Sequence, residues 1–141
     1  MSIKLFAYKQ KSYDECVDFI KWCQNTMNLR DWNILFEYGS GTPTVFGTPE
    51  ENTISPAACI PQWQFLHAYL WVIPERAEIH NVHPFELIAH EMLHVMFSII
   101  YGVAGDKDLE EDDVIITRLE GLYVEMYYRQ HRKKVPTYKE Y

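Results

Sequence analysis

The chain has 141 residues, 48% of them hydrophobic and 15% aromatic, so it can bury one compact core and is too short for two ordinary domains. Its formal charge of −7 would repel a phosphate backbone, and its apolar runs end well before the roughly 20 residues of a membrane span. We therefore expect one soluble domain over residues 1–134 with a C-terminal tail at 135–141, and neither nucleic acid nor a membrane as a partner.

The cysteines indicate the redox compartment. There are three of them, an odd number, and no two form a Cys-x-x-Cys pair; they are Cys16, Cys23 and Cys59. The chain also starts without an apolar stretch of signal-peptide length, so secretion through a cleaved signal is not expected. These features predict free, reduced thiols in a cytoplasmic protein.

The first predicted element is a helix over residues 13–28. It follows Ser12-Tyr13-Asp14-Glu15, which fits a capping box: the Ser12 hydroxyl can accept from a free amide of the first turn while Glu15 reaches back. Apolar residues then recur at spacings of three and four and predict one buried stripe, formed by Cys16, Ile20, Cys23 and Met27.

Three strand candidates follow. Residues 32–38 are rich in strand formers and lead into a loop, 39–56, that has too many glycines and prolines for a helix. Two further strand candidates, 57–60 and 68–73, are separated by Pro-Gln-Trp-Gln. The pattern indicates a small sheet that is antiparallel in part.

Two helical patterns end the chain. From Pro84 to Gly102 the apolar residues recur at helical spacing, which predicts the most buried helix. A second pattern follows the acidic run 106–113 and reaches about Gln130; acids at the positive end of a helix are stabilised there. Together the elements predict an α+β fold, with a small antiparallel or mixed sheet packed on a central helix between an N-terminal and a C-terminal helix.

The central helix contains His90-Glu91-Met92-Leu93-His94, a His-Glu-x-x-His motif. Residues four apart lie on one helical face, so His90 and His94 can bind one Zn²⁺ ion. Glu91 can reach a water held by that metal and act as its general base, which makes it the candidate catalytic residue. The alternative is that the two histidines form hydrogen bonds within the core and bind no metal.

A catalytic zinc normally has three protein ligands, so a further ligand must come from elsewhere. If the last helix returns antiparallel to the central one, the level of the two histidines falls near residues 115–120. Asp113 and Glu120 bracket this window and, seven apart, share a face. Glu120 interrupts an apolar pattern and has the longer side chain, whereas Asp113 lies in an acidic first turn where a solvated role is easy. The residues leave both open as the third ligand.

Other polar groups lie close in sequence. His80 and His83 precede the motif helix, where they could stabilise an oxyanion or serve as loop and capping residues. Tyr123 and Tyr127 follow Glu120 by one and two turns, where they could donate to a tetrahedral intermediate or pack in the core. The aromatic stretch 63–71 is expected in the core and sheet, although an edge strand there could bind an extended peptide.

At these residues the chain resembles the small phage and prophage zinc-metallopeptidase-like proteins of the zincin class, with a minimal gluzincin-type core. The resemblance covers roughly residues 30–130, and its specific part is the His-Glu-x-x-His motif. A helix with an acidic-acidic-x-aliphatic-aliphatic-x-x-Leu pattern is common after that motif and is similar to residues 112–119 here. The family pattern usually has Glu where this chain has Asp. The Cys-x-x-Cys of SprT-like proteins and the further His of metzincins are absent from the sequence.

The resemblance implies a zinc-dependent metallopeptidase that hydrolyses peptide bonds of a peptide or protein substrate in a bacterial or host cytoplasm. His90, His94 and either Glu120 or Asp113 would hold the zinc, and Glu91 would activate the water. A different class of function is a non-catalytic, phage-derived binding or morphogenesis protein that keeps a zincin scaffold. The sequence identifies neither the substrate nor the oligomeric state.

Overall fold

The computed structural model describes residues 4–6, 12–39, 56–104, 109–132 and 138–140. Its elements, in chain order, are β1 (Lys4–Phe6), α1 (Tyr13–Thr26), β2 (Asn33–Tyr38), β3 (Ala57–Gln62), the 3-10 helix η3 (Trp63–Phe65), β4 (His67–Val72), α2 (Pro74–Ile79), α3 (Pro84–Ala104), α4 (Leu109–Gln130) and β5 (Tyr138–Glu140). Within this part of the chain the fold is α+β, as expected.

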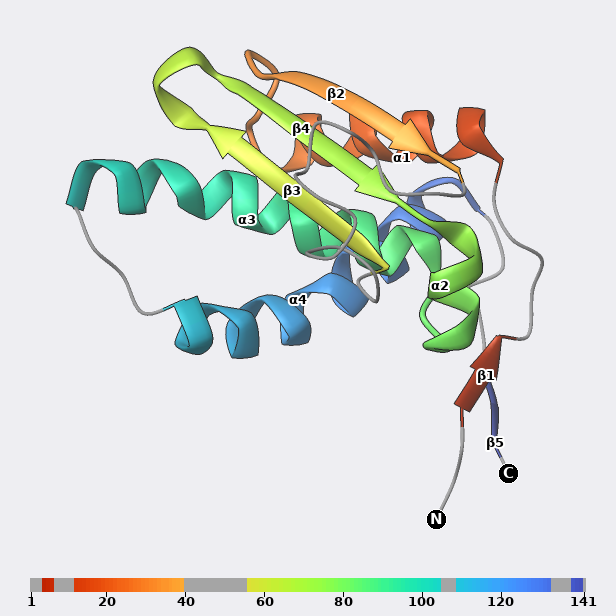
Figure 1. The fold of residues 1–141 in the computed structure, drawn as a ribbon. Helices are drawn as coiled ribbons and strands as arrows, with labels where there is room; N and C mark the ends of the chain where they lie inside the picture. The colour runs from red at the N-terminus through yellow and green to blue at the C-terminus, as the bar shows by residue number, and fades with distance from the viewer. Residues whose placement is uncertain (1–3, 7–11, 40–55, 105–108, 133–137, 141) are drawn as a thin grey trace.

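A three-stranded mixed sheet covers the helices (Figure 1). Its strand order is β2-β4-β3, in which β2 pairs parallel with β4 and β3 pairs antiparallel with the same strand. The helix α3 packs under β3 and β4, α1 packs against α3, and α4 packs against α3 on the side away from the sheet. The two edges of this sheet, β2 and β3, therefore lie over different helices.

The predicted capping box starts α1. The backbone amide of Glu15 donates to Ser12 Oγ over 3.2 Å, and the Ser12 amide donates to Glu15 Oε1 over 3.1 Å. The predicted stripe is buried together with Phe19, which lies on the same side. The helix ends at Thr26, two residues earlier than expected, and the Met27 amide closes its last turn on the Cys23 carbonyl.

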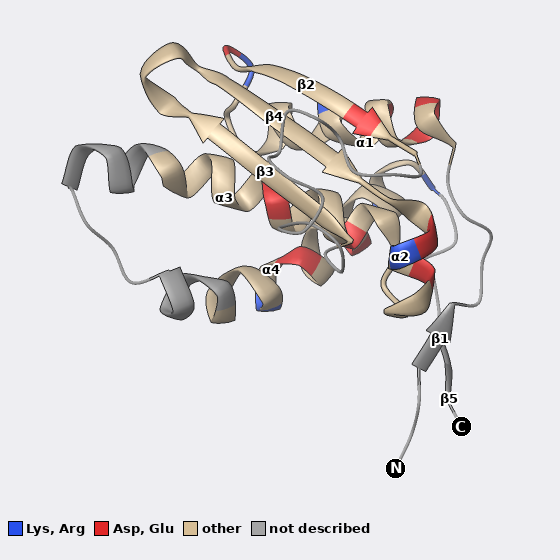
Figure 2. Ribbon diagram, viewed as in Figure 1, with Lys and Arg blue, Asp and Glu red and all other residues tan. Residues whose placement is uncertain are grey.

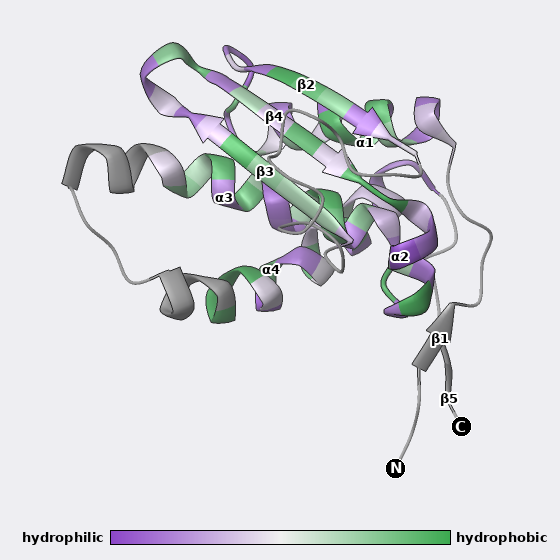
Figure 3. Cartoon of the chain, in the orientation of Figure 1, coloured by the Kyte–Doolittle hydropathy of each residue, from purple (hydrophilic) through white to green (hydrophobic). Residues whose placement is uncertain are grey.

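The central helix α3 is the middle of the core, as its apolar pattern predicted. Six of its described side chains are fully buried: Pro84, Ile88, Ala89, Met92, Leu93 and Val95. The last five belong to the core that the sheet, α1 and α4 complete. At its first turn the rings of Phe85 and Phe19 stack with centroids 4.4 Å apart, which joins α3 to α1. Figure 3 shows hydrophobic stretches along the strands of the sheet and along α3.

Two features were not expected from the sequence. A short helix, α2, begins at Pro74 directly after β4, with Glu75 in its first turn. Residues 138–140, in the segment expected as a tail, form β5 and pair antiparallel with β1. None of the helices in the described ranges is long and apolar enough to cross a membrane.

Candidate metal centre

The start of α3 is fixed by His83, which is fully buried. Its carbonyl accepts from the amides of Glu86 and Leu87, and its ring Nδ1 accepts from the amide of Phe85 over 2.8 Å. The capping role expected for this histidine is therefore confirmed. His80 instead lies exposed at the end of α2.

His90 and His94 lie one turn apart on the same face of α3. Their ring centroids are 5.0 Å apart and the ring planes are inclined by 64°. Both side chains are half-buried, while Met92 and Leu93 between them are fully buried in the core. The predicted arrangement is confirmed: the apolar residues of the motif pack in the core, and the two imidazoles lie beside one another on one face.

The acidic side chain of Glu120 reaches this motif from α4, which runs back along α3 (Figure 1). Its Oε2 lies 2.7 Å from His90 Nδ1, and the two side chains are only 18% and 22% exposed. An ionised carboxylate can only accept, so His90 Nδ1 carries the proton and donates it in a charge-assisted hydrogen bond. The sequence predicted that residues 115–120 lie beside the two histidines, and Glu120 is confirmed at that position.

Asp113 lies seven residues before Glu120 in α4. Two turns of helix separate residues seven apart, so both belong to one side of α4. The side chain of Asp113 lies outside the described residues. Its assignment as a third ligand stays a prediction.

A cysteine that the sequence did not connect with the motif also belongs to this region. Cys59 of β3 packs against the core that α3 occupies. Burial raises the pKa of its thiol, and the charge of nearby Glu91 raises it further. The Cys59 thiol therefore stays neutral, close enough to the proposed base to sense its charge. Strand alternation could place it on the inner side of β3, but nothing in the sequence aligns β3 with Glu91.

The tyrosines that follow Glu120 pack against α1. Tyr127 is buried, its ring lies edge-on to that of Phe19 at 5.0 Å, and burial raises the pKa of its hydroxyl. The half-buried Tyr123 contacts Trp22, with ring centroids 6.3 Å apart. Core packing, one of the two roles expected for these residues, is confirmed for Tyr127.

The donors at the motif are of the types that zinc prefers, two imidazoles and a carboxylate. Across the residues whose side chains are described, however, no three of His, Cys, Asp or Glu are arranged to hold a metal ion. The Glu120 carboxylate contacts the ring of His90, and a carboxylate on one ring nitrogen is the usual way of orienting a histidine that binds metal through the other. The donor chemistry fits zinc, and the contact gives Glu120 a position beside the first ligand.

Comparison of the chain with known protein families, curated proteins and solved structures returned no match. The resemblance to zincins therefore stays a prediction from the motif and from the pattern of the helix after it. Any function has to be argued from the residues of the site themselves.

Proposed function

We propose that the protein is a zinc-dependent metallopeptidase in which His90 and His94 hold the metal and Glu91 is the general base. One observation carries this proposal: a poorly exposed carboxylate, Glu120, comes from a different helix to within 2.7 Å of the first histidine of the motif. Two core histidines that bind no metal could form the same hydrogen bond. A metal-binding pair gains more from it, because the carboxylate orients the ring of His90 and raises the basicity of its other nitrogen.

The chain's own residues supply binding and proton transfer. His90 and His94 provide neutral nitrogen donors on a helix whose position is fixed by the core. When bound, zinc lowers the pKa of a water ligand towards neutrality and polarises the peptide carbonyl. Glu91 accepts the proton of the attacking water and delivers it to the leaving amine. The neutral Cys59 thiol adds no competing charge beside this base.

Two arrangements of the acids agree with this proposal. In one, Glu120 turns from His90 Nδ1 and becomes the third ligand. In the other, it keeps that hydrogen bond and orients His90, and Asp113 completes the set from two turns earlier in α4. In both arrangements α4 supplies the acid.

The position of β3 suggests how a peptide would approach. This strand is an edge of the sheet, packs over α3 and carries Cys59 near Glu91. We therefore propose an extended peptide as the substrate, paired with the edge of β3 so that its backbone passes the motif.

The experiment compares three variants with the wild type. We expect about one zinc per chain by elemental analysis and cleavage of members of a peptide library. Glu91→Gln should keep the zinc and lose about 10² to 10⁴-fold in cleavage rate, because only the base is removed. His94→Ala should lose the zinc. Glu86→Gln, on the same helix one turn before His90, is the matched control and should keep both.

Each failure identifies a different error. A wild type of normal stability that takes up no zinc would remove the metal site, and cleavage that survives Glu91→Gln would remove this mechanism. Zinc without cleavage of any library peptide would favour the non-catalytic binding protein.

A further inference from the structure

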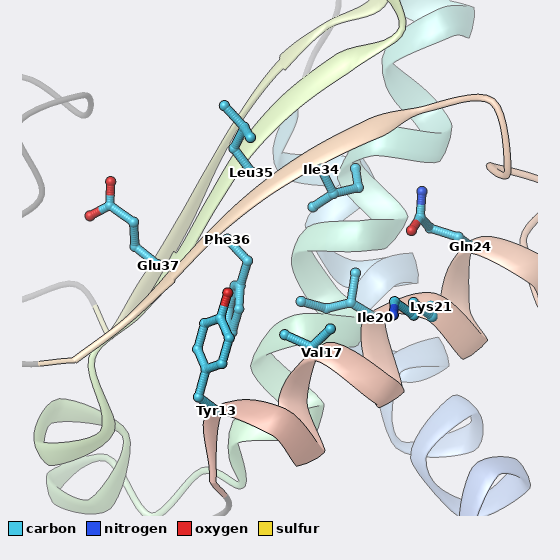
Figure 4. Close-up of a pocket in the computed structure, with 9 residues that line it drawn as sticks. All are labelled: Tyr13, Val17, Ile20, Lys21, Gln24, Ile34, Leu35, Phe36 and Glu37. Atoms are coloured by element: carbon cyan, nitrogen blue, oxygen red, sulfur yellow. The ribbon is translucent and has the colours of Figure 1, made fainter.

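A groove lies between α1 and β2, at the opposite edge of the sheet from the motif. It has a volume of about 300 Å³. Tyr13, Val17 and Ile20 of α1 form one wall, and Ile34 and Phe36 of β2 form the other (Figure 4). The Tyr13 and Phe36 rings stack across it with centroids 5.6 Å apart, and together with Val17, Ile20 and Ile34 they make the middle of the groove apolar.

The backbone of β2 is open along this groove. The amides of Asn33 and Gly39 donate to carbonyls of the β4 side, Leu66 and Val72, over 2.9 and 3.3 Å. A parallel ladder uses every second residue, so the odd-numbered residues of β2 bond to β4. Ile34 and Phe36 consequently direct their N–H and C=O groups to the free edge, where no described residue pairs with them.

The side chains of β2 follow the same alternation. Ile34 and Phe36 are half-buried on the side facing α1, whereas Leu35 and Glu37 are exposed on the other side (Figure 4). In an antiparallel pair, residues directly opposite one another point to the same face. A strand added at this edge would therefore form its hydrogen bonds with Ile34 and Phe36 and place the side chains opposite them in the groove.

The two ends of β2 lie beside opposite charges. Lys21 lines the groove and also a second hollow, which it shares with Arg30. Gln24, which borders both hollows, lies beside Ile34, so the cations belong to the start of β2 (Figure 4). Glu37 lies near the other end of β2, on the face of the strand away from α1, and Figure 2 shows further acidic positions at the start of α1. Asp31 follows Arg30 but lines neither hollow.

We propose that this groove binds an extended peptide as an additional strand antiparallel to β2. The peptide has apolar side chains opposite Ile34 and Phe36, an acidic residue towards its C-terminus and a basic residue towards its N-terminus. The charges set the direction: an antiparallel peptide brings its C-terminal end to Lys21 and Arg30 and its N-terminal end to Glu37. This site is independent of the metal centre, which lies under the other edge of the sheet.

The probe is the peptide Ac-Arg-Val-Thr-Val-Thr-Glu-NH₂, added to the full-length protein labelled with ¹⁵N. We expect amide shifts in β2 and α1 and not in β3 or the motif. The same peptide with Arg and Glu exchanged should bind about tenfold more weakly, because both ends then meet like charges. Lys21→Glu combined with Glu37→Lys should reverse that preference.

Two matched pairs test the strand pairing itself. N-methylation of the Val opposite Ile34 removes a hydrogen bond to β2 and should weaken peptide binding about tenfold or more. The amide of the Thr opposite Leu35 points away from β2, so N-methylation there should weaken binding less. On the protein, Ile34→Pro removes the outward N–H without touching the ladder to β4, and Ile34→Ala keeps it. We expect Ile34→Pro to bind about tenfold more weakly than Ile34→Ala. If Ile34→Pro does not fold, the methylated peptides decide the question alone.

Several results would overturn the proposal. They are the absence of shifts at millimolar peptide, shifts confined to β3 and α3, and equal affinity of the two N-methylated peptides. Sedimentation that shows a dimer broken by Ile34→Pro and not by the peptide would assign the edge to a second copy of the chain instead.

Discussion

The two edges of the central sheet differ in what lies beneath them. Under β3 the helix α3 is enclosed by the sheet, α1 and α4, and six of its described side chains are fully buried. Beside β2 the helix α1 buries only one stripe and leaves Tyr13, Val17 and Lys21 along an open groove. An enclosed helix holds polar side chains in fixed positions, which a metal centre needs, whereas a helix with one free side shapes a surface on which a ligand can lie.

Substitutions of two aromatic residues of α1 test this difference most strongly. Phe19 is fully buried among Phe85, Trp22 and Tyr127, so Phe19→Ala should lower the free energy of unfolding by about 3 to 5 kcal/mol. Tyr13 stacks on Phe36 but is 50% exposed, so Tyr13→Ala should cost less than about 1 kcal/mol. Urea unfolding of both variants provides the measurement. Similar losses would mean that the groove is part of the core.

The acids of α4 come next in expected effect. Glu120→Gln should lower zinc affinity about 10 to 100-fold, because the amide loses the charge that His90 donates to while keeping its size. Asp113→Asn should lower zinc affinity less if Glu120 is the third ligand. Competition with a chelator measures both variants. A larger loss of zinc affinity in Asp113→Asn than in Glu120→Gln would make Asp113 the third ligand. As a control, neither variant should change the binding of the strand peptide at β2.

The helices of this fold could be predicted because their signals are local. The capping box of Ser12 and Glu15, Pro84 at the first position of α3 and the apolar spacing of both helices gave their positions to within a few residues. The turn of α2 could also have been found, because Pro74 followed by Glu75 is a helix-start signal. Pairing of β1 with β5 joins residues more than 130 apart, and short strands carry no signal of their partner.

Within the candidate site, too, the residues set by local helical spacing could be predicted and those set by packing of the sheet could not. His90 and His94 follow from one helical face, and Glu91 is next to His90 in sequence. Glu120 follows from counting residues back along two antiparallel helices, and the predicted window was wide enough to include it. Cys59 could not be predicted, because its place beside Glu91 depends on how the sheet is rotated over α3. The groove was missed because the open edge of β2 depends on strand order, which alternation within one strand does not reveal.

The buried thiol of Cys23 in α1 makes the free energy of unfolding depend on pH. Burial raises its pKa, so the folded protein keeps the proton that the unfolded chain releases above about pH 8.5. The stability that this thiol contributes is complete below that pH and is lost as the pH rises towards the folded pKa, by at most about 1.4 kcal/mol per pH unit. Cys23→Val cannot ionise, so its free energy of unfolding should fall less steeply between pH 8 and 10. Parallel curves for the two proteins would contradict this expectation.

The smallest expected effect concerns the first turn of α1, which carries one end of the groove. Ser12→Ala removes the oxygen that accepts from the Glu15 amide and should lower the free energy of unfolding by about 1 kcal/mol. Glu15→Gln keeps an acceptor for the Ser12 amide and should cost less, which makes it the matched control. Because this turn positions Tyr13 against Phe36, Ser12→Ala should also weaken the strand peptide while zinc affinity stays unchanged. A loss of zinc affinity in Ser12→Ala would show that α1 and α3 respond as one unit, and that the two edges of the sheet are not separate sites.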